Sequence, residues 1–217
     1  MDRDPTLSVP DAGPPIPFTA TYAETFTIMA DLNADTAHPT TAEHVNAVGW
    51  MRTFSGMKVT PLDLRPEMVD ITDIAHALSR IGRFGGHAAG FISVAGHSIA
   101  VMAMVAKHTD DPRMILTGLL HDASEAYIGD IIRPIKKHPR VMHTLWAAEE
   151  RIHEVVAQVF GTYYPHPELV VQADDERLAW EMENIRDSDS HISNMNEDRA
   201  DFVLNFARLR RIINQGL

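Results

Sequence analysis

The stretch Ile115-Leu-Thr-Gly-Leu-Leu-His-Asp-Ala-Ser-Glu-Ala-Tyr-Ile-Gly-Asp130 places a histidine and an aspartate directly after an apolar run. Its apolar residues have the spacing of a helix that packs into a core. Burying a carboxylate there costs several kcal/mol unless a cation or good hydrogen-bond partners compensate it. Together with His97 upstream and Asp174 downstream, the pair His121-Asp122 therefore indicates a metal site.

The sequence on both sides of this stretch predicts further helices. The first begins at Asp70 as N-cap, with Asp73 in the capping-box position, and the third begins at Asp111 with Pro112 in its first turn. Strand signals are sparse outside residues 50–60, so we expect an all-α bundle of about six helices. The helical segments are residues 70–81, 93–108, the segment from 111, the segment from 139 to 161, 167–186 and 197–213.

The 217 residues, 45% of them hydrophobic, suit one globular domain with a tail. Five prolines within residues 1–20 favour an extended or disordered arm, while residues 21–60 combine a possible short helix with an extended segment from Trp50 to Gly56. We therefore expect an irregular N-terminal arm over residues 1–45 and a helical domain over residues 46–217.

Composition excludes several classes of function. The net charge of −11 disfavours binding of a nucleic acid polymer, because that needs a basic face. The absence of cysteine excludes disulfides, thiolate metal sites and a cysteine nucleophile, so a metal must bind His, Asp or Glu. No apolar run approaches the roughly 18 residues that span a bilayer, and no signal peptide is recognisable. We expect a cytoplasmic protein that does not bind membranes.

Helix lengths bring the candidate ligands together. An antiparallel hairpin that turns at residues 109–111 puts His97, about 13 residues before the turn, at the height of His121, about 11 residues after it. Asp174 arrives as a fourth ligand from a separate helix, and the adjoining Asp175 is expected to be solvated. Glu125 lies one helical turn beyond His121 and Asp122.

The order His97, His121-Asp122, Asp174 resembles the HD-domain phosphohydrolases, whose His, His-Asp and Asp bind one divalent metal within a helical core. The likeness covers residues 70–186 and is greatest to bacterial 5′-deoxynucleotidases and related phage enzymes. Like these, the chain continues through Gly129-Asp130 into Pro134-Ile-Lys136, and an Arg-aromatic pair, Arg83-Phe84, precedes the first histidine. Two positions depart from the relatives: Gly96 replaces a frequent Glu, and Phe84 replaces the usual Trp.

The resemblance implies a hydrolase that releases phosphate from (deoxy)nucleoside 5′-monophosphates, and a homodimer. The site would bind one divalent transition metal, Co²⁺, Mn²⁺, Zn²⁺, Ni²⁺ or Fe²⁺, because histidine and carboxylate ligands accept all of these ions. Glu125 and Asp130 are the candidate catalytic residues, for activation of water and protonation of the leaving group, in either assignment. The substrate would contact Arg83, Phe84, Ile131, Ile132, Arg133 and Lys136.

Three alternatives stay open: a nucleoside triphosphate triphosphohydrolase of the same fold, a two-metal phosphodiesterase or oxygenase, and a non-catalytic nucleotide-binding module. A two-metal protein would use extra histidines between the dyad and the last aspartate, yet the spacing of these residues favours exposed or capping roles. They are His138, His143, His153 and His166. His76 and His87, on either side of Arg83-Phe84, are at least as well explained by structural roles.

Overall fold

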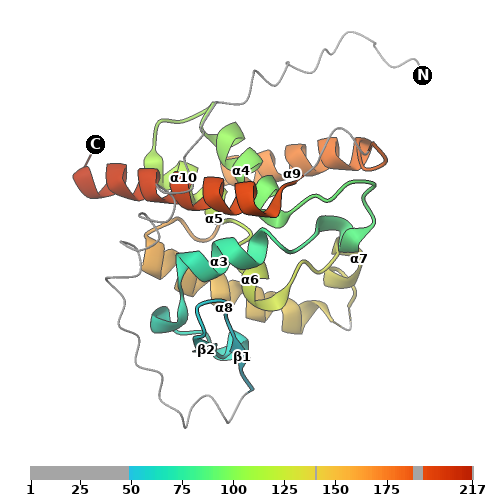
Figure 1. Cartoon of the computed structure of the whole chain (residues 1–217), viewed down its shortest axis with the longest axis horizontal. Coiled ribbons are helices and arrows are strands. Elements are labelled where there is room, and N and C mark those ends of the chain that lie inside the picture. Colours follow the sequence, from blue (N-terminus) through green and yellow to red (C-terminus); the bar gives the residue numbers. More distant parts are fainter. Residues whose placement is uncertain (1–48, 140, 188–192, 217) are drawn as a thin grey trace.

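The computed structural model describes residues 49–139, 141–187 and 193–216, shown in Figure 1. The expected arm over residues 1–45 lies outside this range. Six helices of eight or more residues dominate the described chain and confirm the all-α prediction. They are α3 (Ile71–Leu78), α4 (Val94–Val105), α5 (Pro112–Leu120), α8 (Met142–Phe160), α9 (Glu168–Glu183) and α10 (Met195–Gln215).

Shorter elements connect these helices. Two four-residue helices, α6 (Glu125–Ile128) and α7 (Arg133–Lys136), follow α5, and 3-10 turns cover Pro61–Asp63, Pro66–Met68 and Arg83–Gly86. The expected extended segment forms a small antiparallel hairpin of β1 (Met51–Arg52) and β2 (Lys58–Val59), in which Met51 pairs with Val59. In the described part of the chain, no helix has the length and apolarity needed to span a bilayer.

Local capping explains where three of the helices begin. The Asp70 carboxylate accepts hydrogen bonds from the backbone N–H groups of Thr72 and Asp73, and the Ser93 and Asp111 side chains cap α4 and α5 in the same way. The capping box expected at Asp73 is wrong. Its carboxylate instead accepts from the backbone N–H and the hydroxyl of Ser55, at 2.7 and 2.8 Å, and so joins the β-hairpin to α3.

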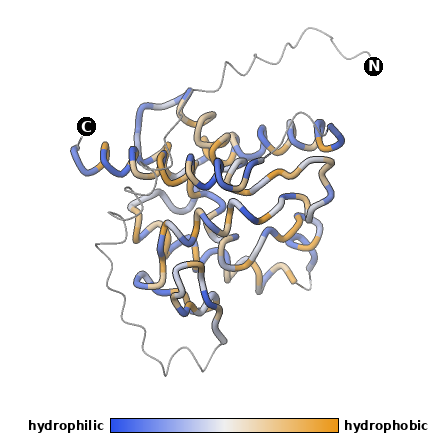
Figure 2. The backbone as a smooth tube through the Cα atoms, in the orientation of Figure 1, coloured by the Kyte–Doolittle hydropathy of each residue, from blue (hydrophilic) through white to orange (hydrophobic). Residues whose placement is uncertain are grey.

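The core lies where α3, α5, α8 and α10 meet. Ile74, Leu116, Leu119, Ile152 and Phe202 are fully buried there. In Figure 1, α10 lies across the bundle, with α4 and α9 on one side and α3 and α8 on the other. Apolar residues alternate with hydrophilic ones along the helices, as Figure 2 shows. A second, smaller cluster lies between α4 and α9, where Val101 and Val105 pack with Val170 and Ala173.

The helices α4 and α5 form the expected hairpin and pack closely. A Cβ atom at Gly118 would lie 3.1 Å from Cγ2 of Val105 and 3.3 Å from Cα of Met102, so only glycine permits this approach without a shift. The α5 helix ends at Leu120. The following turns tighten to backbone hydrogen bonds between residues three apart, such as Ala123 N–H to Leu120 and Glu125 N–H to Asp122. The dyad therefore lies in a turn at the helix end, and Glu125 begins a separate short helix.

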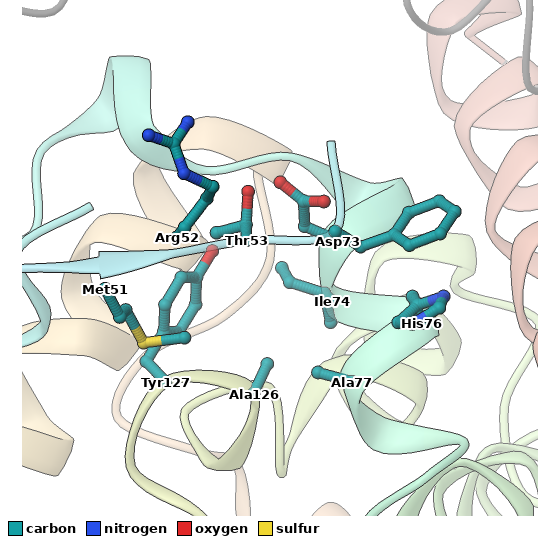
Figure 3. Close-up of a pocket in the computed structure, with 10 residues that line it drawn as sticks. Met51, Arg52, Thr53, Asp73, Ile74, His76, Ala77, Ala126 and Tyr127 are labelled. Atoms are coloured by element: carbon teal, nitrogen blue, oxygen red, sulfur yellow. The ribbon is translucent and has the colours of Figure 1, made fainter. Parts of the chain in front are cut away.

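A cavity of about 320 Å³ lies between the hairpin, α3 and α6 and is drawn in Figure 3. Its lining residues include none of the predicted site residues. His76, which we weighed as a substrate contact, is one of them and stacks on Phe54 with 3.8 Å between ring centroids. The lining consists of Met51, Arg52, Thr53, Phe54, Asp73, Ile74, His76, Ala77, Ala126 and Tyr127.

Candidate metal centre

Four side chains that the sequence singled out as ligands converge in the structure. His97 comes from the first turns of α4, His121 and Asp122 from the end of α5, and Asp174 from α9. Nε2 of His97 lies 3.0 Å from Oδ1 of Asp174 and 3.7 Å from Oδ2 of Asp122. Nε2 of His121 lies 3.2 Å from Oδ2 of Asp122 and 3.6 Å from Oδ1 of Asp174. Two imidazole nitrogens and two carboxylate oxygens thus face one small volume.

The orientation of His121 suits a bound cation. Its Nδ1 lies 2.9 Å from the carbonyl oxygen of Gly118, which can only accept, so Nδ1 donates and Nε2 faces the carboxylates. Among the described residues, the buried Nε2 has no hydrogen-bond partner of acceptable geometry. A nitrogen lone pair facing two carboxylates is stable only with a proton or a cation between them. Candidate ligand atoms of His97, His121 and Asp122 all lie within 4.8 Å of one another, a grouping that fits a metal ion.

The electrostatics agree with this fit. Burial opposes a charge on His121, but Asp122 and Asp174 outweigh it and raise the pKa of this histidine well above its usual value. Burial likewise opposes ionisation of Asp122, yet His121, His97 and Arg83 hold its pKa well below the usual range. A site that attracts a proton this strongly attracts a divalent cation for the same reason, and the two compete for the same nitrogen.

Sequence reasoning missed Glu181, which is fully buried beside the centre. Its carboxylate accepts from Nδ1 of His97 at 3.0 Å, Nε of Arg177 at 2.9 Å and Nε of Arg83 at 2.8 Å. The available signal was its place on the face of α9 that carries Asp174, two turns earlier. A lone glutamate near the end of a charged helix gives no other sign of burial.

The two predicted catalytic carboxyls lie next to the ligands. Burial, then Asp122 and Asp130, raise the pKa of the buried Glu125 to about 9. Oε1 of Glu125 is 3.4 Å from Nζ of Lys136, whereas its Oε2 has no hydrogen-bond partner within the described chain. Burial also raises the pKa of Asp130, which is hydrogen-bonded to the backbone of Phe84. Both carboxyls therefore hold a proton more strongly than an exposed carboxyl does, as is common for groups at functional sites.

Arg83, a predicted substrate contact, is paired with carboxylates of the protein itself. Only 8% of it is exposed, its Nε donates to Glu181, and its Nη1 lies 3.5 Å from Oδ2 of Asp122. Its guanidinium carbon lies 5.4 Å from the centre of the Phe84 ring. Phe84 has φ 58° and ψ 26°, a left-handed conformation that is uncommon outside glycine, so this turn holds local strain beside the candidate site.

The other predicted substrate residues lie in the segment that carries α7. Ile131 is partly buried, while Ile132 is 38% exposed and its side chain faces Gly85. Nη2 of Arg133 lies 2.9 Å from Oδ1 of Asp175 and 3.7 Å from Oδ2 of Asp174. Lys136 donates to Glu149 at 2.7 Å as well as facing Glu125. The segment therefore contacts α8, α9 and the turn after α3.

Two of the intervening histidines are not exposed. His138 and His143 are at the surface, as expected, whereas His153 and His166 are partly buried. Of the two expected roles, exposed or capping, His166 has the capping one, because it bonds the carbonyl oxygen of the C-cap residue of α5. The ring centroids of His153 and His166 are 4.8 Å apart, and Nε2 of His166 donates to the carbonyl oxygen of His121 at 3.2 Å. This hydrogen bond therefore helps to hold the backbone of His121 in place.

Packing explains why glycine precedes the first ligand histidine. A Cβ atom at Gly96 would lie 3.0 Å from Oγ of Ser193 and 3.2 Å from Oγ of Ser93. Ser93 itself is hydrogen-bonded to the backbone of Gly96 and to the carboxylate of Asp198 in α10. The start of α10 thus occupies the space that a longer side chain would need.

Comparison with known proteins agrees with this geometry. Residues 85–210 match the family model described as HD domain. The uncharacterized protein YfdR of Escherichia coli K12 is 31% identical over 136 residues, which are 60% of this chain and 72% of YfdR. An uncharacterized protein of Rhodobacter capsulatus is 40% identical over 91 residues, which are 40% of this chain and 46% of that protein. With the family model matching more than half of its length, the chain belongs to the HD-domain family of metal-dependent phosphohydrolases.

Proposed function

We propose that this protein releases inorganic phosphate from (deoxy)nucleoside 5′-monophosphates with the aid of one divalent transition metal. The observation that carries the proposal is the convergence of His97, His121, Asp122 and Asp174 beside two carboxyls of raised pKa, the buried Glu125 and the partly buried Asp130. A divalent ion held by these four ligands would act as a Lewis acid toward the phosphoryl group and would acidify water.

The protein's own residues supply the proton transfers. Oε2 of Glu125 has no partner in the described chain, so it can accept a hydrogen bond from the attacking water. A bound divalent cation would lower the raised pKa of Glu125 and ionise it, and the carboxylate could then accept the proton of that water. Lys136, 3.4 Å from Oε1, balances the charge of the ionised carboxylate. Asp130 has a raised pKa and is anchored on the backbone of Phe84, which suits it to protonate the leaving nucleoside oxygen. We assign the role of general base to Glu125 because the nearby Lys136 can stabilise its ionised form.

Charge and exposure support a small phosphorylated substrate. Arg133 is about half exposed and, within the described residues, pairs with two carboxylates of α9, so its guanidinium can turn to a phosphate at the mouth of the site. The Ile132 side chain lies against Gly85, the residue after Phe84. Phe84 is partly exposed and Ile132 is exposed, so both are available to a nucleoside. A net charge of −11 also argues for a compact ligand rather than a nucleic acid polymer.

The test is a screen of purified full-length protein against nucleoside mono-, di- and triphosphates, in ribose and deoxyribose forms, with Mn²⁺ or Co²⁺ and product identification. We expect phosphate from monophosphates and one metal ion bound per chain. Release of triphosphate from triphosphates, or a stoichiometry of two metal ions, would replace the proposal with an alternative of the same fold. Lack of hydrolysis across the whole panel would favour a non-catalytic module. Light scattering of the same sample tests the expected homodimer.

A further inference from the structure

Glu181 has the features of a residue that supports ligands rather than one that binds metal itself. It is fully buried in the last turns of α9, and both of its oxygens are used. Oε1 accepts from Nδ1 of His97 and Nε of Arg177, and Oε2 accepts from Nε of Arg83. Two of these three partners are arginines, which can only donate, so both oxygens of Glu181 act as acceptors. An ionised, fully paired carboxylate is the stable form at this position.

These bonds fix which nitrogen of His97 can face a cation. An ionised carboxylate only accepts hydrogen bonds, so Nδ1 of His97 must donate to Glu181. The other nitrogen, Nε2, lies 3.0 Å from Oδ1 of Asp174 and 3.7 Å from Oδ2 of Asp122. A carboxylate behind a histidine ligand fixes the tautomer and the ring orientation and increases the basicity of the ligating nitrogen.

The same carboxylate reaches a second ligand through Arg83. Oε2 of Glu181 accepts from Nε of Arg83, and Nη1 of that arginine lies 3.5 Å from Oδ2 of Asp122. Glu181 thus contacts His97 directly and Asp122 through one intermediate. Because α9 also carries Asp174, one helix supplies both a ligand and the support of two others.

We propose that Glu181 is a positioning residue of the metal centre, which sets the tautomer of His97 and, through Arg83, the orientation of Asp122. This role rests on the proposed function, because it presumes that these residues bind a divalent ion. In a Glu181→Gln variant, one oxygen becomes an NH₂ group that faces a donor. At least one of the three hydrogen bonds must then be lost, while the volume of the side chain is kept.

The test is the affinity for Co²⁺, measured by competition with a chelator. We expect Glu181→Gln to bind Co²⁺ about 10- to 100-fold more weakly than the wild type, the range for partners of ligand histidines. Glu183→Gln, two residues later on the exposed side of α9, is the matched control and should stay within about twofold. Unfolding of the metal-free variants is measured alongside, because a merely structural role would lower stability and leave Co²⁺ affinity unchanged.

A second measurement needs no variant and applies even if Glu181→Gln does not fold. In wild-type protein loaded with Zn²⁺, nitrogen NMR of the assigned His97 ring should show a protonated Nδ1 and a deprotonated Nε2. Wild-type Co²⁺ affinity in Glu181→Gln, or a deprotonated Nδ1 of His97, would overturn the positioning role and leave the proposed function standing. If the wild type binds neither ion, the proposed function fails, and the positioning role fails with it.

Discussion

The two sides of the candidate metal centre differ sharply in burial. On the side of α9 and α4, His97, Arg83 and Glu181 are 8% exposed or less. On the side of α7, Arg133 has a side chain 50% exposed, and Ile135 is 47% exposed. Buried charges must be fully paired, whereas exposed pairs contribute little and exchange partners readily. The buried side therefore determines whether metal binds, and the exposed side is where substrates can be distinguished.

The first prediction compares two adjacent aspartates, Asp174, which is a predicted metal ligand, and Asp175, which belongs to the exposed side. Asp174→Asn should reduce Co²⁺ affinity by more than about 100-fold, beyond the range for partners of ligands, and phosphate release should be lost with it. The Asp175 side chain is 59% exposed and pairs with Arg133, so Asp175→Asn should keep both properties. Isothermal titration with Co²⁺ and a phosphate assay measure the two variants. If only Asp175→Asn lost the metal, Asp175 and not Asp174 would be the ligand.

The second prediction separates catalysis from metal binding on the buried side. Glu125→Gln should lower kcat by about 10²- to 10⁴-fold, because a general base is removed, while Co²⁺ affinity changes only a few-fold. Glu150→Gln, at an exposed position of α8, serves as the control for the loss of one surface carboxylate. Steady-state kinetics with a nucleoside monophosphate give kcat. A parallel fall in metal affinity would instead make Glu125 a ligand.

The sequence predicted those parts of the fold and site that depend on local patterns. The caps Asp70, Ser93 and Asp111 act within three residues of their partners, and the lengths of two joined helices place His97 opposite His121. Glu181 escaped prediction because its partners His97 and Arg83 are 84 and 98 residues away.

The ion-pair partners of the arginine and lysine side chains that were predicted to contact substrate could not be inferred from the sequence either. Arg83 and Lys136 were predicted as substrate contacts, and both lie beside carboxylates of helices far along the chain, Glu181 of α9 and Glu149 of α8. His166 was expected to be exposed or capping, and its capping partner, the backbone carbonyl of His121, lies 45 residues earlier. Such pairings depend on how helices pack, and no local pattern in one sequence records that packing.

The third prediction concerns specificity at the turn between the two sides. Phe84→Trp should change the ratio of kcat/KM for deoxyribose and ribose monophosphates by about 5- to 150-fold, corresponding to roughly 1–3 kcal/mol for a small change in a pocket. Phe84→Ala keeps the strained backbone at φ 58° but removes the ring, so it separates the effect of the aromatic side chain from that of the turn. An unchanged ratio in both variants would place the sugar away from Phe84.

The smallest effect is expected at Arg133 on the exposed side. Its ion pair with Asp175 joins two largely exposed side chains, so Arg133→Gln should change the free energy of unfolding by less than about 1 kcal/mol. If this guanidinium turns to the substrate phosphate, KM rises about tenfold or less with kcat unchanged, and the difference from wild type shrinks as salt is added. Lys137→Gln, an exposed cation four residues later, should leave KM unaltered. Equal KM changes in the two variants would mean that the positive charge of the α7 segment attracts the substrate without a specific contact from Arg133. A fall in kcat would mean that Arg133 acts in the chemical step as well as in substrate binding.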